Sequence, residues 1–115
     1  MVLLDVGMNK IRDLIYDDLL NGQSGTSGTV PGITNTVLLS PIASTLSALS
    51  SKSITDKRIT VAHSISSTTA NGQLLQEFGV TFTDGTFLNR VVHAPISKNN
   101  TLEIDYITSF FINNG

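Results

Sequence analysis

The chain has 115 residues, room for one domain with its own core, and no cysteine, which excludes a disulfide framework and thiolate metal sites. Its net charge is −2 and only 14% of its residues are charged, which argues against nucleic acid as a partner and predicts that other proteins cover part of the surface. The first residues lack the pattern of a secretory signal and no apolar run approaches the roughly 20 residues of a membrane helix, so we expect a soluble protein made in a cytoplasm, without a membrane partner.

Residues 7–20 carry the one convincing helical pattern. The apolar residues that recur at helical spacing are Met8, Ile11, Leu14 and Ile15. Asp5 could cap the start of this helix. Because Asp17 and Asp18 would oppose the helix dipole at its carboxyl end, we expect the helix to stop near Tyr16 and a strand to begin at Leu19.

Residues 21–32 are rich in glycine and hydroxyl side chains and predict a surface loop. A phosphate-binding loop of the Walker type is excluded, because no lysine occurs between Lys10 and Lys52. The Gly-x-Ser-x-Gly pattern of a nucleophile elbow is not present either. We therefore expect a connection whose glycines allow tight turns.

The middle of the chain contains one clear strand, residues 58–65, which alternates apolar and polar positions. Its inward side is predicted to carry Ile59, Val61, His63 and Ile65. Residues 33–41 look irregular, and the many serines of residues 43–54 make that stretch a poor core strand. Turns are expected at residues 56–57 and 68–72.

The strongest local signal is a hairpin over residues 76–92, because Asp84-Gly85 suits the two central positions of a type I′ turn. The pairs that a two-residue loop predicts are Phe82 with Phe87, Val80 with Asn89, and Phe78 with Val91. On the other face Glu77 and Arg90 become diagonal neighbours and can form a cross-strand ion pair. We interpret this pair as structural rather than catalytic.

Residues 101–112 predict a long final strand after a turn at residues 97–100, and Pro95 indicates an edge or a break before it. One side of the final strand is predicted to carry Leu102, Ile104, Tyr106, Phe110 and Ile112. Because Ile107 and Phe111 face the other way, the strand is apolar on both sides. It is therefore either central to a two-layer core or covered by another subunit.

Strands spaced roughly ten residues apart after a single helix indicate a mainly β fold, an antiparallel β-sandwich of about six to eight strands with one short N-terminal α-helix. We expect one domain over residues 1–115, with an N-terminal arm and helix over residues 1–20 and the sandwich over residues 21–115. A parallel α/β sheet is excluded, because the polar stretches between strands are too short for crossover helices.

His63 and His93 are the two histidines of the chain, and with Glu77 they could form a 2-His-1-carboxylate zinc site. The spacing signatures of metal motifs are missing, so we interpret both as ordinary strand residues. No paired carboxylates or nucleophile with its base can be recognised. We expect no metal, no cofactor and no enzymatic activity. The glycosylation sequon at residues 99–101 is interpreted as a turn.

A family resemblance spans nearly the whole chain and rests on the order of five segments. A short helix over residues 7–15 precedes the glycine-threonine loop of residues 25–29, and later come residues 75–80, residues 85–92 and the closing strand of residues 102–106. In this order the chain resembles small virion proteins of tailed phages and archaeal tailed viruses. Those proteins are related to the N-terminal domains by which tail fibres and baseplate components attach.

The resemblance implies a structural protein located in the virion, which binds copies of itself, as a trimer or higher ring, and other virion proteins. The contact residues that it implies are Val2, Leu3 and Leu4 of the N-terminal arm, Gly25, Thr26 and Gly28 of the loop, and Phe110, Phe111 and Ile112 of a C-terminal tail that runs to Asn114. A tail-associated role in fibre or baseplate attachment is expected, and a capsid decoration or vertex protein is the alternative. A carbohydrate-binding sandwich is more remote, because tryptophan is absent and most aromatic residues occupy predicted core positions, so a host glycan has no support as a partner.

Overall fold

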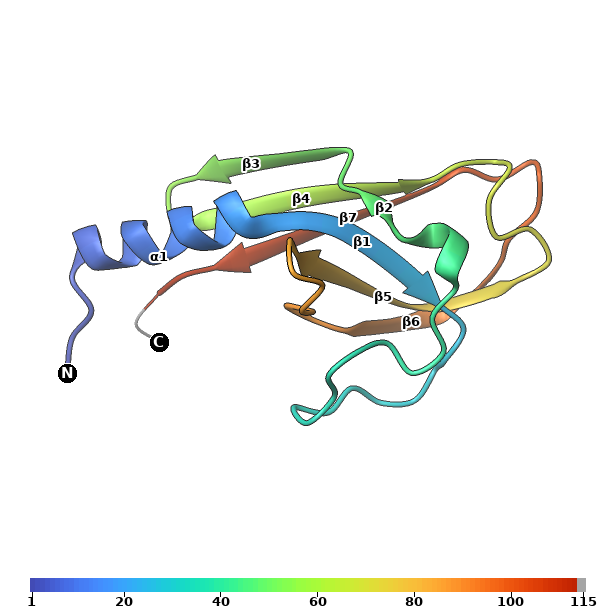
Figure 1. Ribbon diagram of the computed structural model, residues 1–115, viewed down its shortest axis with the longest axis horizontal. Helices are drawn as coiled ribbons and strands as arrows, with labels where there is room; N and C mark the ends of the chain where they lie inside the picture. The colour runs from blue at the N-terminus through green and yellow to red at the C-terminus, as the bar shows by residue number, and fades with distance from the viewer. Residues whose placement is uncertain (114–115) are drawn as a thin grey trace.

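The computed structural model describes residues 1–113, which form one helix and seven strands in two antiparallel sheets (Figure 1). The elements are α1 (Asp5–Asp18), β1 (Leu19–Gly25), a 3₁₀ turn (Ala43–Thr45), β2 (Ser47–Ala48), β3 (Ser51–Thr55), β4 (Arg58–Ile65), β5 (Leu74–Phe82), β6 (Val91–Ser97) and β7 (Ile104–Phe111). One sheet has the strand order β2-β1-β5-β6 and the other has the order β3-β4-β7. The predicted mainly β, sandwich-like fold with one N-terminal helix is confirmed.

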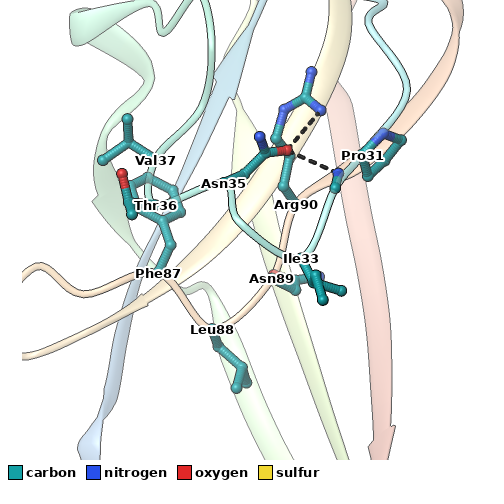
Figure 2. A pocket seen from close by; sticks show the side chains of 10 residues that line it. Pro31, Ile33, Asn35, Thr36, Val37, Phe87, Leu88, Asn89 and Arg90 are labelled. Atoms are coloured by element: carbon teal, nitrogen blue, oxygen red, sulfur yellow. Dashed lines mark hydrogen bonds between the residues drawn. The ribbon is translucent and has the colours of Figure 1, made fainter.

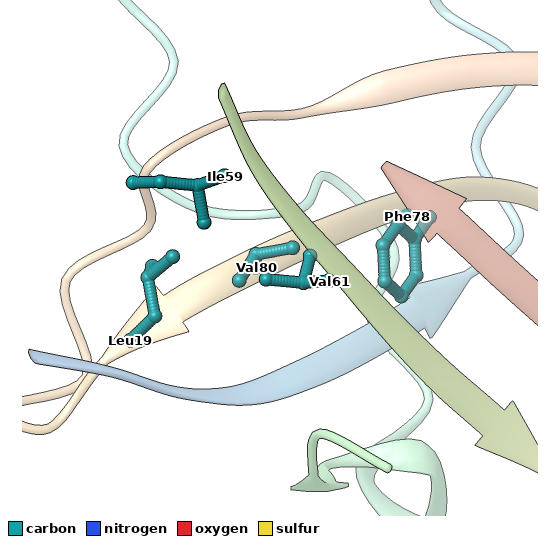
Figure 3. Close-up of a cluster of buried hydrophobic side chains, with 5 residues drawn as sticks. All are labelled: Leu19, Ile59, Val61, Phe78 and Val80. Carbon is teal, nitrogen blue, oxygen red and sulfur yellow. The ribbon is translucent and has the colours of Figure 1, made fainter. Parts of the chain in front are cut away.

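The core lies between the two sheets, where β4 and β5 face each other (Figure 3). Its fully buried apolar side chains are Leu19, Ile59, Val61, Phe78 and Val80. The predicted inward side of β4 is confirmed, because every second residue from Ile59 to Ile65 is buried and those between them are half-buried. Each such side chain contributes about 1.5–3 kcal/mol when it leaves water, so this cluster holds the sheets together.

The helix continues past Tyr16 to Asp18, so the predicted stop near Tyr16 is wrong, whereas Leu19 does begin a strand. Lys52 explains the difference, because its Nζ donates to the carbonyl oxygens of Tyr16 at 2.6 Å and of Leu19 at 3.1 Å. The Thr83 N–H donates to the Asp18 carbonyl at 2.9 Å. Tertiary contacts thus supply the positive charge and the donors that the helix end needs.

The amino end of α1 projects beyond the sheets, at the end of the molecule where β7 also ends (Figure 1). Leu4 occupies the N-cap position and Asp5 lies in the first turn, so Asp5 is not the cap that the sequence suggested. The helix is held to the β3–β4 turn by Arg12, which donates to the Asp56 carbonyl at 2.8 Å, and by an ion pair of Asp5 with Lys57 at 3.3 Å. Met8 is the buried residue of the helix.

Residues 21–25 form part of β1, between β2 and β5, so the prediction that they belong to a loop is wrong. Gly22 pairs with Val80, and a Cβ atom on Gly22 would lie 2.6 Å from the His63 Cγ. The glycine therefore permits close packing of the two sheets rather than a turn. Ser24, two residues along the same face, is also fully buried.

The β5–β6 connection contains a three-residue loop, Thr83 to Gly85, rather than the predicted type I′ turn. Gly85 has a φ of 89° and its N–H donates to the Phe82 carbonyl at 3.0 Å, while the Phe82 N–H donates to the Thr86 carbonyl at 2.8 Å. This is the three-residue arrangement in which a type I turn is followed by a glycine with positive φ. The extra residue shifts the register near the turn: Thr81 pairs with Phe87, so the predicted Phe82–Phe87 pair is wrong, whereas Phe78–Val91 is confirmed. Val80 and Asn89 meet through a side chain, because the Val80 N–H donates to the Asn89 Oδ1 at 2.9 Å.

Strand β7 begins at Ile104, three residues later than predicted, and residues 99–101 form the expected turn. It is the outer strand of the three-stranded sheet, which excludes a position at the centre of the core. Its residues alternate strictly between exposed and half-buried. Pro95 lies in β6, the outer strand of the other sheet, as predicted for a residue that donates no backbone hydrogen bond.

Candidate functional site

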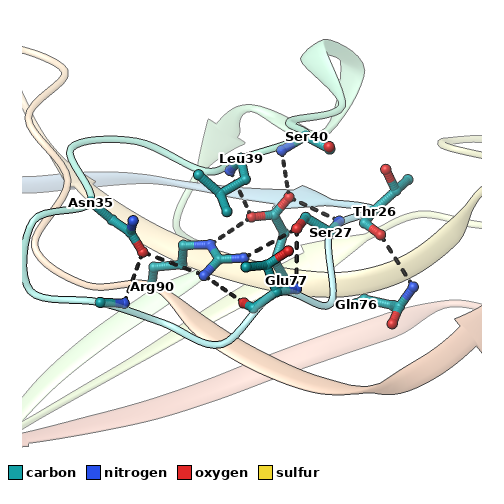
Figure 4. A network of polar contacts seen from close by, with 10 residues as sticks. Thr26, Ser27, Asn35, Leu39, Ser40, Gln76, Glu77 and Arg90 are labelled. Atoms are coloured by element: carbon teal, nitrogen blue, oxygen red, sulfur yellow. Dashed lines mark hydrogen bonds and ion pairs between the residues drawn. The ribbon is translucent and has the colours of Figure 1, made fainter.

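The predicted ion pair of Glu77 and Arg90 exists and is buried (Figure 4). The Arg90 Nε lies 2.8 Å from the Glu77 Oε1, and the two side chains are 5% and 0% exposed. The sequence placed this pair on a sheet face. The structure instead encloses it beneath the segment of residues 26–40, which crosses that face of β5.

The second partner of Glu77 is the backbone of this covering segment. Its carboxylate accepts N–H hydrogen bonds from Ser27 at 3.1 Å, Leu39 at 2.9 Å and Ser40 at 2.8 Å. Burial alone would raise the pKa of Glu77, but the hydrogen bonds from Arg90 and from these N–H groups outweigh burial and hold the pKa below its ordinary value. Glu77 is therefore an anion at neutral pH, and it anchors the segment.

Arg90 also binds the covering segment. Its Nη1 donates to the Thr29 carbonyl at 2.9 Å and approaches the Asn35 Oδ1 at 3.5 Å, and its Nη2 approaches the Ser27 Oγ at the same distance. The guanidinium group thus contacts the covering segment near Ser27 and Thr29 and again at Asn35. These contacts are intramolecular, so the Arg90 side chain stabilises the fold and its donors are occupied within the protein.

The candidate contact residue Gly25 is buried against this network, which removes it from the accessible surface. A Cβ atom at Gly25 would clash with the Glu77 carboxylate and the Ser40 carbonyl. At Gly28, which is exposed, a Cβ would lie 2.5 Å from the Gln76 Oε1, and Thr26 is half-buried. Glycine is therefore needed at positions 25 and 28 because the chain there lies close to Glu77 and Gln76 of β5.

A cavity of about 350 Å³ lies between the covering segment and the chain that leads into β6 (Figure 2). It is lined by Pro31, Gly32, Ile33, Asn35, Thr36, Val37, Phe87, Leu88, Asn89 and Arg90. Most of its lining side chains are apolar, and the Arg90 head group is occupied by Glu77 and the loop. The cavity offers space for an apolar group and has no acid–base pair or nucleophile in its lining.

The two histidines lie at opposite ends of a row of four rings. The ring centroids are 5.5 Å apart for His63 and Phe78, 4.2 Å for Phe78 and Tyr106, and 5.4 Å for Tyr106 and His93. The His63 Nε2 is 2.8 Å from the Ser47 Oγ, and the His93 Nε2 is 2.8 Å from the Tyr106 hydroxyl. Burial lowers the pKa of His63 and raises that of Tyr106.

The structure does not bring the histidines and Glu77 together as metal ligands. Across residues 1–113 no group of three His, Asp or Glu side chains converges in a way that could hold a metal ion. Sequence reasoning missed Lys98, a buried lysine whose Nζ donates to the Asn71 Oδ1 and the Asn99 carbonyl, both at 2.9 Å. These contacts join the two turns at one end of the sandwich, and no sequence pattern predicted them.

The remaining candidate contact residues lie near the two termini. Val2 is 76% exposed, Leu4 is 69% exposed and Phe111 is 64% exposed. The half-buried ones are Leu3, Phe110 and Ile112, and Asn114 lies outside the described residues. The N-terminal arm and the last strand thus expose apolar side chains at the same end of the molecule (Figure 1).

Comparisons with known proteins found no matching family model, no similar curated protein and no similar solved structure. Within the described chain, none of the helical segments is both long and apolar enough for a membrane crossing.

Proposed function

We propose that this chain is a structural subunit of a virus particle, which acts by binding copies of itself and other virion proteins. The observation that carries the proposal is the apolar surface exposed by the N-terminal arm and α1. Leu4, Gly7, Ile11 and Leu14 follow one another at intervals of three, four and three residues, the spacing of a helix–helix seam. Ile11 is 39% exposed and Leu14 is 57% exposed.

This seam lies beside the face of α1 that packs on the body of the protein, not on it. Arg12 contacts the β3–β4 turn and Met8 is the buried residue of the helix, and both lie about 100° around the helix from the seam. Ile11 and Leu14 therefore keep much of their surface uncovered in a single copy. Burial of one such leucine against a second chain contributes about 1.5–3 kcal/mol, so association stabilises an otherwise exposed arrangement.

The chemistry of the interior also supports a structural role. The buried charged groups are held by hydrogen bonds: those of Glu77 and Arg90 connect the covering segment to β5, and those of Lys98 join two turns. A structural subunit needs such fixed loops, because its contacts depend on a rigid surface. The assignment to a virus particle, and to a tail-associated component within it, comes from the resemblance of the sequence, with a capsid decoration or vertex protein as the alternative.

The proposal is tested by the mass of the purified chain in light scattering over a concentration series. We expect a multimer that dissociates on dilution, and a trimer or hexamer would favour a tail ring. Leu14→Ser should lower the mass at a given concentration, because it removes an exposed seam residue. Val30→Ser is the matched control, since Val30 is 81% exposed and belongs to the covering segment, which lies away from α1 (Figure 1). A wild-type chain that stays monomeric at high concentration would overturn the proposal.

A further inference from the structure

We infer that β7 of one copy pairs antiparallel with β7 of a second copy about a two-fold axis at Ser109. The pairing would join the two three-stranded sheets into one continuous six-stranded sheet. This inference rests on the proposed function, because it names the surface through which copies of the chain associate. It does not depend on the α1 seam, which lies on a different element.

The outer strands of the two sheets differ in how they are protected against pairing. Strand β2 has two residues, β6 contains Pro95 and a register irregularity against β5, and β3 carries Lys52, whose carbonyl accepts a hydrogen bond from Tyr16. Short length, proline, bulges and lysine are the devices that block edge pairing. Strand β7 has eight residues that pair with β4 in unbroken register, without proline or lysine, and its one charged residue, Asp105, lies next to its first residue.

Both faces of β7 leave apolar surface uncovered, which fits a missing neighbour strand. On the outer face Ile107 is 72% exposed and Phe111 is 64% exposed. On the inner face Tyr106 and Phe110 are half-buried although they point toward the core. Within residues 1–113 no strand pairs with the other edge of β7, so the backbone groups on that side are open to a partner.

The side chains of β7 select one register for self-pairing. An axis through a residue keeps outer-face side chains opposite one another. An axis through Ser109 sets Ile107 opposite Phe111 of the second copy, twice by symmetry, and pairs apolar with apolar. An axis through Thr108 would instead set Phe111 opposite Asp105, the acidic residue of the strand.

The inner face agrees with the same axis. With Ser109 on the axis, Tyr106 lies opposite Ile112 of the second copy and Thr108 lies opposite its Phe110. Aromatic and β-branched residues are favourable cross-strand partners. Because an unrelated strand would have to match this alternation by chance, a second copy of β7 is the partner that the pattern fits best.

Single cysteine substitutions test the pairing directly, since the natural chain has no cysteine. In Ser109→Cys the two thiols would face each other at the axis, with Cα atoms about 4.5–5.5 Å apart, within the range of a disulfide. Ser53→Cys is the matched control, because Ser53 is also an exposed serine on the outer face of this sheet. The two Ser53 positions would be about 24 Å apart across the joined sheet.

We expect mild oxidation to convert Ser109→Cys into a covalent dimer and to leave Ser53→Cys unlinked, at concentrations where the wild-type chain is multimeric. A trimer, which has no two-fold axis, would overturn the β7 pairing alone, and so would a multimeric wild-type chain whose Ser109→Cys variant cross-links no better than the control. A monomeric wild-type chain would overturn the proposed function as well, so the two failures are distinguishable by light scattering.

A second variant removes the need for a disulfide. Ile107→Lys introduces a charge at an exposed edge position, which should reduce the mass of the assembly while the circular dichroism spectrum stays that of the wild type. Ser53→Lys adds the same charge on the same face away from β7 and should leave the mass unchanged. A synthetic peptide with the β7 sequence should compete with a second copy and also lower the mass of the assembly. If the peptide has no effect and Ile107→Lys associates as the wild type does, another surface joins the copies.

Discussion

The buried ion pair of Arg90 Nε with Glu77 Oε1, at 2.8 Å, connects three parts of the chain that are distant in sequence. Glu77 belongs to β5, Arg90 precedes β6, and both bind the covering segment of residues 26–40. A strand pair of this kind normally holds only two strands in register. Here it also anchors a long loop, so its loss should affect more of the structure than one hairpin.

Glu77→Gln should destabilise the fold by about 3–5 kcal/mol, because it leaves a buried guanidinium without its counter-charge. The free energy of unfolding from urea denaturation measures this loss. Asp13→Asn is the control, since Asp13 pairs with Arg12 at the surface with its side chain 51% exposed. The control should change stability by no more than about 1 kcal/mol, and equal losses in the two variants would contradict a structural role for Glu77.

Gly25→Ala should destabilise the fold by about 1–3 kcal/mol, because its methyl group would clash with the Glu77 carboxylate and the Ser40 carbonyl. Gly32→Ala is the matched control in the same segment, where a Cβ would have no other atom within 4 Å. Thermal unfolding of the two variants side by side tests the difference. Similar midpoints would mean that the segment does not press on β5 as described.

Stability should fall in two stages as the pH is lowered. Burial depresses the pKa of His63 in the folded protein, so the stability that its neutral form contributes is complete above about 6.5. Below that pH the histidine is protonated more readily in the unfolded chain than in the folded one, and the contribution is lost. Burial would raise the pKa of Glu77, but the hydrogen bonds from Arg90 and from the N–H groups of Ser40, Leu39 and Ser27 together hold this pKa below its ordinary value. The contribution of Glu77 is therefore complete above about 4.5 and is lost as the pH falls below that value.

Urea denaturation at a series of pH values from 8 to 3 would resolve the two stages. His63→Gln has no titrating ring, so it should abolish the decline that begins near 6.5 and keep the later one. A variant with the same decline as the wild type in the upper range would show that His63 is not responsible.

Lys52→Met should destabilise the fold by about 1.5–3 kcal/mol, since a charged donor to the carbonyl oxygens of Tyr16 and Leu19 is lost. The Lys52 Nζ also lies 4.6 Å from the centre of the Tyr16 ring, and that attraction disappears too. Lys10→Met changes an exposed lysine of α1 and should alter stability by less than about 0.5 kcal/mol. Chemical denaturation followed by helical circular dichroism compares the two.

Local patterns were enough to predict the elements whose burial repeats with a regular period. The alternation of residues 58–65 correctly placed Ile59 and His63 on the inward side of β4. The alternation on either side of residues 84–85 correctly paired Phe78 with Val91 and brought Glu77 near Arg90, although the loop has one residue more than predicted. In each case the information lies within a few residues of the feature, because strand periodicity is a local property.

The tertiary structure alone decided where each segment lies in the sandwich and what covers it. Residues 21–25 look like a loop because glycine and serine have low strand propensity, yet they form β1, since their small side chains let the sheets approach at His63. The burial of Glu77 depends on a segment some 40 residues earlier in the chain, and the open edge of β7 depends on which strand lies beside it. Contacts between segments distant in sequence leave no local pattern, because they arise only when the chain closes on itself.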